Sequence, residues 1–389
     1  MRPMIFLSGI VLVSCFGSSV QAMLAPPAGP FHDAVDIVGP SPQVSIKKYL
    51  IAAAAAGGAL YTLKGRLGKT KDHVTEQPLD NQEAALEEGS LSPFSLKELT
   101  TRLQGFPVSK PSFLDASDGT KLAYYSYVPA DPKAIVVFCH GAGLHSGALY
   151  QYFAQQLSEN HAIGCYLFDR RGHGFSEGPR GDAPSVQQMF DDITTAIDFV
   201  GSAHSGTPIF LGGHSAGGGL ILNYGASTAH PLVKGSILIA PYLGRNSEAL
   251  KTPPTPAEAF VKSVKVWMFI LNGISNGRFC GHSPAVFFNH PQELIKKDPL
   301  IVTNYTVTMM TACSPENPRQ SLEKLAQPLA LFASENDELF DAPTLIGYKS
   351  SFPLLLSNMC VADKITQSTH LDCMLDAAPY CASFINRIV

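Results

Sequence analysis

The chain has 389 residues, of which 45% are hydrophobic and 15% are charged, and its formal net charge is −4. This composition is typical of a globular protein with one large domain and shorter appendages, and it excludes a chain that is disordered throughout. The slightly acidic balance and the lack of a Lys/Arg stripe between aromatic residues favour no nucleic-acid partner.

The N-terminal region predicts export or attachment to a membrane. Residues 1–22 contain Arg2, an apolar run and small residues ending at Ala22, so we interpret them as a signal peptide or an uncleaved membrane anchor. The residues around Cys15 are similar to a bacterial lipobox, and whether this cysteine is lipidated stays open.

Residues 23–93 hold a second apolar segment and a linker. The apolar run at 49–63 is shorter than the about 20 residues of a spanning helix, so it is a marginal span or a helix lying on a surface. The polar, acidic stretch at 69–93 is typical of a linker. We expect the first 70 residues to hold the protein at a membrane. Basic residues after the second run favour the cytoplasmic side, whereas Ala22 favours export.

From residue 94 the sequence predicts one α/β domain. Residues 113–114 and 121–127 are predicted strands around an Asp-Gly turn. Strands and helices then alternate, which implies a mostly parallel sheet flanked by helices. The further predicted strands are 134–139, 162–168, 208–212, 235–240, 329–333 and 360–365, and the predicted helices are 148–159, 185–199, 217–226 and 377–388. Residues 243–320 interrupt the alternation and predict an inserted cap over the strand ends.

Three serines lie in the motif Gly-x-Ser-x-Gly, which is typical of a nucleophile elbow. An elbow requires a strand that ends at the motif and a helix that begins directly after it. Ser215 has both. Ser176 is followed by Gly178-Pro179, and Ser275 lies in the predicted cap without a preceding strand. We therefore predict Ser215 as the nucleophile of a serine hydrolase.

The remaining parts of such a site follow other predicted strands. A Gly-rich loop begins at His140, and we expect the amides of Ala142 and Ala216 to form an oxyanion hole. The acid and the base should follow the nucleophile in the chain, each after a strand, and Asp337 and His370 occupy these places. Two further acids in the same loop, Glu335 and Asp341, are less well placed alternatives.

Cysteine usage predicts neither disulfides nor a metal site. The eight cysteines include no CxxC pair, and Cys139 and Cys165 lie in apolar runs, so we expect free thiols in the core. Cys280, His282 and His290 resemble a ligand group only loosely, and we predict no metal. Proton transfer and electrostatic stabilisation carry the predicted chemistry, so we expect no cofactor.

Three segments together resemble the monoacylglycerol lipase and lysophospholipase group of serine α/β-hydrolases. They are residues 140–147, 169–181 and 213–218, in the order and at the spacing of that group, and the likeness extends over about residues 105–389. The resemblance implies the α/β-hydrolase fold with a helical cap. It also implies hydrolysis of a single-chain lipid ester, a monoacylglycerol or lysophospholipid, through an acyl-enzyme.

For the site, the resemblance implies the triad and oxyanion hole predicted above. Two positions depart from the group, because Ala216 stands where Met is common and Ser334 where a Gly usually opens the acid loop. An esterase or peptidase of the same fold is the alternative, and a non-catalytic membrane-bound binding module is a weaker one. Residues 266–270 form either an apolar contact surface or part of the core of the cap.

Overall fold

The computed structural model describes Phe94 and residues 96–389. The predicted signal peptide or anchor at 1–22, the apolar segment at 49–63 and the linker up to residue 93 lie outside the described residues. The chain divides into two units, Met1–Ala84 and Ala85–Val389, and all features described below belong to the second. Within the described part, no helix has both the length and the apolar character needed to cross a membrane.

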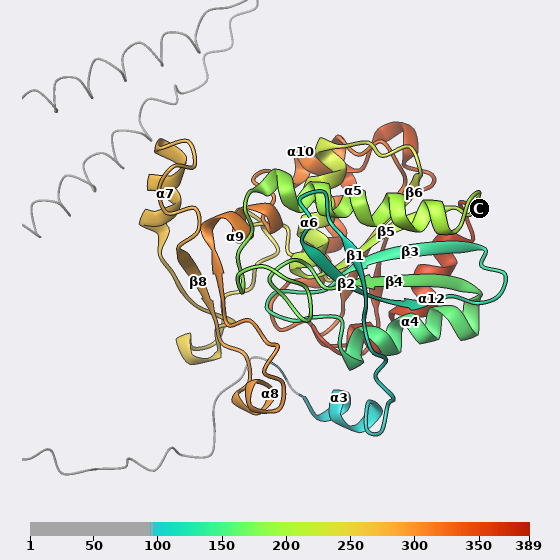
Figure 1. The fold of residues 1–389 in the computed structure, drawn as a ribbon, viewed down its shortest axis with the longest axis horizontal. Helices are drawn as coiled ribbons and strands as arrows, with labels where there is room; N and C mark the ends of the chain where they lie inside the picture. The colour runs from blue at the N-terminus through green and yellow to red at the C-terminus, as the bar shows by residue number, and fades with distance from the viewer. Residues whose placement is uncertain (1–93, 95) are drawn as a thin grey trace, which may run out of the picture. The chain divides into compact units, whose positions relative to one another are not determined.

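An eight-stranded sheet forms the centre of this unit, in the order β1-β2-β4-β3-β5-β6-β10-β11 (Figure 1). Strand β2 pairs antiparallel with both β1 and β4, and the neighbours from β4 through β3, β5, β6 and β10 to β11 pair parallel. The mostly parallel sheet predicted from the sequence is therefore confirmed. Its strands are β1 Ser112–Asp115, β2 Lys121–Tyr127, β3 Ala134–Cys139, β4 Ile163–Phe168, β5 Ile209–His214, β6 Val233–Ile239, β10 Leu329–Ser334 and β11 Val361–Ile365.

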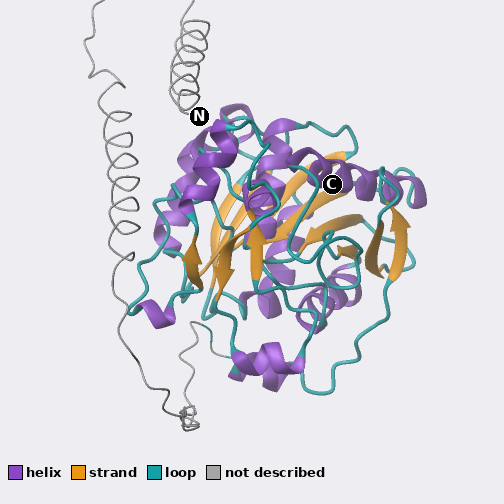
Figure 2. Ribbon diagram, turned by 60° about the vertical axis from the view of Figure 1, so that its left-hand side comes forward, coloured by secondary structure: helices purple, strands orange, loops and turns teal. Residues whose placement is uncertain are grey.

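Helices cover both faces of the sheet (Figure 2), and the side chains of each strand alternate between two cores. On β3, Ile135 and Val137 join the core that also contains residues of α5 and α6, whereas Val136 and Phe138 join the core with residues of α4 and α12. The covering helices are α4 Ala148–His161, α5 Val186–Ala203, α6 Ala216–Ser227 and α12 Cys373–Ile385. Because both faces are covered, the central strands are continuous apolar runs.

Between β6 and β10 lies the insertion that the sequence predicts as a helical cap. It contains helices, but also a three-stranded antiparallel sheet that the sequence did not predict. Strands of three to five residues are too short to show a period of two, which explains the omission. Its elements are η1 Pro256–Glu258, β7 Val261–Val264, α7 Val266–Ile274, β8 Pro284–Phe288, α8 Gln292–Lys297, β9 Asn304–Thr306, α9 Val307–Cys313 and α10 Pro318–Glu323.

Short elements complete the unit. They are α3 Lys97–Arg102, α11 Ala342–Gly347, η2 Tyr348–Ser351 and η3 Leu354–Leu356. The seven cysteines of the described part are all free, and five of them are buried.

Candidate active site

Ser215 lies at a sharp turn between the end of β5 and the start of α6. Its φ is +53°, a conformation that residues other than glycine rarely adopt. The flanking glycines allow the close approach, because a Cβ on Gly213 would lie 2.4 Å from the carbonyl carbon of Gly217. A Cβ on Gly217 would lie 2.3 Å from the carbonyl oxygen of Cys139. The sequence Gly-His-Ser-Ala-Gly therefore forms the strand–turn–helix geometry of a nucleophile elbow.

The structure brings Ser215, His370 and Asp337 into one series of hydrogen-bond contacts. Nε2 of His370 is 3.0 Å from Oγ of Ser215, and Nδ1 of His370 is 2.8 Å from Oδ2 of Asp337. All three residues are buried. The other carboxylate oxygen of Asp337 accepts hydrogen bonds from the N–H groups of Leu339 and Phe340, at 2.8 and 3.0 Å. A carboxylate fixed in this way favours the proton on Nδ1, which leaves Nε2 free to accept the serine proton.

The neighbours of His370 fix its ring and its backbone. The ring stacks on Phe94 at 5.8 Å between centroids and meets the edge of Phe340 at 5.1 Å. Its backbone N–H donates to Glu338, and its carbonyl accepts from Nε2 of His214. Burial raises the pKa of Glu338 and lowers the pKa of His214 well below its ordinary value. The sequence analysis missed Glu338, and its only signal there is its position next to Asp337.

The alternative acids have other partners. Glu335 forms an ion pair with Lys364 and accepts a hydrogen bond from the N–H of Gln367. Asp341 caps α11, where its carboxylate accepts hydrogen bonds from the N–H and the hydroxyl of Thr344. Neither carboxylate forms a hydrogen bond or ion pair with the imidazole of His370, whereas that of Asp337 does, so the geometry favours Asp337.

The other two motif serines have structural contacts. Oγ of Ser176 donates to the carbonyl of Asp169 at 2.6 Å and accepts from the N–H of Ala123 at 2.8 Å. Oγ of Ser275 donates to the carbonyl of Asn272 at the end of α7. Both serines therefore stabilise local loops.

The two residues predicted for the oxyanion hole, Ala142 and Ala216, lie beside Ser215. Neither N–H group has a hydrogen-bond acceptor within residues 96–389, and both residues line one cavity with Ser215. Ala216 opens α6, so its N–H is among those without an acceptor in the helix and carries the positive end of the helix dipole. Hydroxyl groups hold the Gly-rich loop, since the N–H of Gly141 donates to Tyr150 and that of Gly143 to Tyr305.

Side chains of residues 169–181 stabilise the Gly-rich loop through buried hydrogen bonds. The buried guanidinium of Arg170 donates to the carbonyl of Gly141, the hydroxyl of Tyr305 and the sulfur of Cys313, each at 2.9 Å. The carboxylate of Asp169 accepts from the N–H groups of Ser146 and Phe175, and burial raises its pKa. Asp169 therefore belongs to the loop framework.

A cavity of about 770 Å³ opens onto Ser215. Its walls come mainly from the insertion and from the loop after β10, and they are largely apolar. The apolar lining residues include Tyr242, Leu250, Phe260, Val261, Phe288, Met310, Leu339 and Phe340. The size falls within the range of about 300–1,000 Å³ that is typical of ligand sites.

His282 and His290, two of the residues that loosely resemble a ligand group, lie in different surroundings. His282 lies 3.0 Å from a carboxylate oxygen of Asp182. His290 is buried, and burial lowers its pKa to about 4. Among the described residues, no group of three or more His, Cys, Asp or Glu side chains is arranged to hold a metal ion.

The strand order and the elbow define the class of the protein, an α/β-hydrolase with a serine at the nucleophile position. Residues 130–345 match the family described as serine aminopeptidase, S33. The chain belongs to this family. It is a hydrolase of the lipase and esterase type, which confirms the resemblance stated from its motifs.

Curated relatives and solved structures agree with this membership. Rat monoglyceride lipase is 30% identical over 247 residues, which cover 61% of this chain and 77% of the relative, and the human enzyme is 29% identical with the same coverage. The monoacylglycerol lipase of Paleococcus ferrophilus has a TM-score of 0.52 at 19% identity and covers 68% of this chain and 99% of its own. A soluble variant of monoglyceride lipase from Saccharomyces cerevisiae, in complex with a substrate analog, has a TM-score of 0.53 at 15% identity, covering 77% and 99%. These two structures share the fold.

Proposed function

We propose that the protein hydrolyses a carboxylic ester of a single-chain lipid, a monoacylglycerol or a lysophospholipid, through an acyl-enzyme on Ser215. The observation that carries the proposal is the contact series from Ser215 through His370 to Asp337 beside an apolar cavity of about 770 Å³. The relatives described as monoglyceride lipases support the substrate class.

In the proposed reaction, His370 removes the proton of Ser215 as Oγ attacks the ester carbonyl. The amides of Ala142 and Ala216 stabilise the oxyanion, and Asp337 stabilises the charged imidazole. His370 then gives the proton to the departing alcohol. Water, activated by the same imidazole, releases the fatty acid and restores the serine. Proton transfer and fixed dipoles supply the catalysis, so the mechanism uses no cofactor.

The walls of the cavity predict a preference for one acyl chain. We expect monoacylglycerols and lysophospholipids to exceed triacylglycerols in kcat/KM by at least about tenfold, or about 1.4 kcal/mol in the barrier. Substrates with the same acyl group, dispersed in the same detergent micelles, make the comparison fair. Equal or faster turnover of triacylglycerol would contradict the single-chain assignment.

A peptidase is the second candidate, because the matching family is described as a serine aminopeptidase. Glu258 and Glu338 line the cavity, and a carboxylate there could pair with a peptide amino terminus. Aminoacyl p-nitroanilides test this reading directly, and activity confined to them would overturn the lipid proposal. A fluorophosphonate probe that fails to label Ser215 would favour the non-catalytic binding module instead.

The exposed side chains of α7 support peripheral binding to a membrane. Trp267, Ile270 and Ile274 are 57%, 53% and 63% exposed, and α7 lies at the outer end of the insertion (Figure 1). Phe269 instead packs against the core, so residues 266–270 are partly exposed and partly packed against the core. Exposed basic residues flank the helix at Lys262, Lys265 and Arg278. Apolar residues beside basic ones are typical of helices that lie in a membrane interface.

Trp267 is the only tryptophan of the chain, so its fluorescence reports on α7 alone. We expect vesicles with anionic lipid to shift its emission to shorter wavelengths, because the indole leaves water for the interface. Ile270→Asp should weaken the shift. Leu355→Asp should not, although Leu355 is 95% exposed, because it lies in η3. Emission that stays unchanged on vesicle-bound protein would exclude α7 as the contact.

A further inference from the structure

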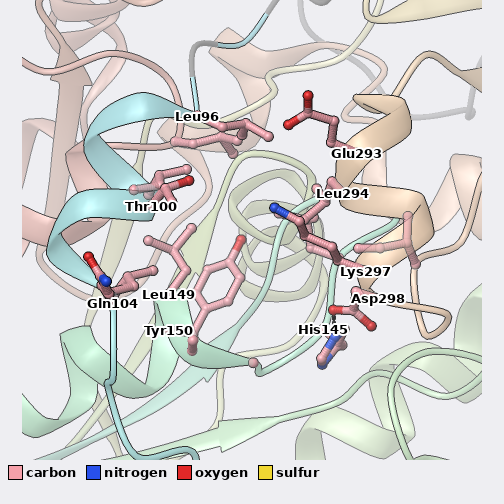
Figure 3. Close-up of a pocket in the computed structure, with 17 residues that line it drawn as sticks. Leu96, Thr100, Gln104, His145, Leu149, Tyr150, Glu293, Leu294, Lys297 and Asp298 are labelled. Atoms are coloured by element: carbon pink, nitrogen blue, oxygen red, sulfur yellow. Dashed lines mark hydrogen bonds and ion pairs between the residues drawn. The ribbon is translucent and has the colours of Figure 1, made fainter.

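A second cavity, of about 560 Å³, lies among α3, the start of α4 and α8 (Figure 3). Most of its lining is apolar, and its polar residues include Thr100, Gln104, Glu293, Lys297 and Asp298. The apolar lining residues include Leu96, Leu99, Leu103, Leu144, Leu149, Leu294, Ile301 and Leu371. Residues of α3 precede the 130–345 segment that matches the family, so this cavity depends partly on a segment outside that match.

Two leucines lie between this cavity and the reaction centre. A small space of about 10 Å³ is lined by Ser215 and His370, and Leu144 and Leu371 line both that space and the second cavity. The side chains of these two leucines therefore lie at the boundary between the second cavity and the catalytic serine.

The chemistry of the proposed reaction distinguishes the two cavities. His370 must protonate the departing alkoxide, so the alcohol half of the ester lies on the side of the imidazole. His370 and its neighbour Leu371 line the small space, whereas the 770 Å³ cavity is lined by Ser215 but not by His370. By this criterion the acyl half of the ester is assigned to the larger cavity, which also holds both predicted oxyanion-hole residues, and the alcohol half to the second cavity.

We infer that the second cavity binds an alkyl chain on the alcohol half of the substrate, so that the enzyme also cleaves esters of long-chain alcohols. In this step the ester C–O bond breaks, the acyl group bonds to Oγ of Ser215, and the alcohol oxygen receives the proton that His370 took from the serine. The inference rests on the roles proposed for Ser215 and His370. The volume of the cavity is within the range of ligand sites, and its leucines match an alkyl chain.

The test uses the full chain and a series of octanoate esters in which only the alcohol changes, from ethanol to butanol to octanol. Burial of one methylene improves binding by up to about fourfold, so we expect kcat/KM to rise at least about tenfold from the ethyl to the octyl ester. Thr100→Trp places an indole in the second cavity and should abolish the rise. Thr101→Trp, one residue further along α3 and outside the lining, should retain it.

The acyl side supplies a reciprocal variant, because Met310 lines only the larger of the two cavities. Met310→Trp should reduce the dependence on acyl length and retain the dependence on alcohol length. A rate that does not rise with alcohol length, or a rise that persists in folded Thr100→Trp protein, overturns the inference.

If no ester of the series is cleaved, the proposed function is contradicted, and the inference about the second cavity needs a test that does not depend on catalysis. Equilibrium binding of 1-decanol then tests the cavity alone. If the Thr100→Trp variant binds 1-decanol at fewer sites or with lower affinity than the Thr101→Trp variant, the alcohol site is supported. Identical binding in the two variants overturns it.

Discussion

Ser215→Ala is expected to lower kcat about a million-fold, which is the scale of loss when the nucleophile of a serine hydrolase is removed. The substitution removes one hydroxyl at a position where its hydrogen-bond contact is with His370, so the fold should remain intact. Hydrolysis of a short p-nitrophenyl ester, followed with pure protein, measures the loss, and circular dichroism checks the fold.

Ser275→Ala is the matched control, since this serine has the same motif but binds the end of α7. Its turnover should equal that of the unchanged protein. Ser176→Ala should lower thermal stability more than turnover, because its hydroxyl makes two buried hydrogen bonds. A Ser215 variant that keeps its rate would remove the basis of the proposed mechanism.

His370→Ala should cost about as much as the serine change, because serine and histidine act as one unit. Asp337→Asn should cost less, on the order of ten-thousandfold in kcat, because the amide favours the wrong imidazole tautomer. The double variant Ser215→Ala/His370→Ala should be no slower than either single variant. Additive losses in the double variant would show that the two residues do not share a step.

The acid loop offers two controls for the aspartate. Glu335→Gln and Asp341→Asn remove charge from the same loop, yet their carboxylates bind Lys364 and Thr344 rather than the imidazole. Both variants should stay within about threefold of the normal kcat, well under 1 kcal/mol in the barrier. If either loses more activity than Asp337→Asn, the acid has been assigned to the wrong residue.

Much of the fold could be predicted from the sequence because its signals are local. The apolar runs of β3 to β6 are buried on both faces, and such runs are visible without any knowledge of their partners. The choice of Ser215 among three serines also used local information, since an elbow needs only a strand, glycines and a helix in succession. The strands of the insertion are too short to show an apolar run or a period of two, so the sequence did not predict them.

The acid loop shows what sequence order leaves undecided. Four acids, Glu335, Asp337, Glu338 and Asp341, lie within residues 335–341 and follow the same strand, so spacing alone does not select one. In the structure, the N–H groups of Leu339 and Phe340 orient the carboxylate of Asp337 toward His370. This orientation depends on how the loop after β10 packs against the loop after β11.

The sequence by itself determined the class of the domain, and it predicted the nucleophile position and the order of the candidate catalytic residues. Only the tertiary structure decided which groups support them: Glu338 on the backbone of His370, and Arg170 behind the Gly-rich loop. Only the tertiary structure also forms the second cavity, whose lining includes residues of α3 and α8. These contacts join segments that are far apart in the chain, and packing of the whole domain brings them together, so no local pattern encodes them.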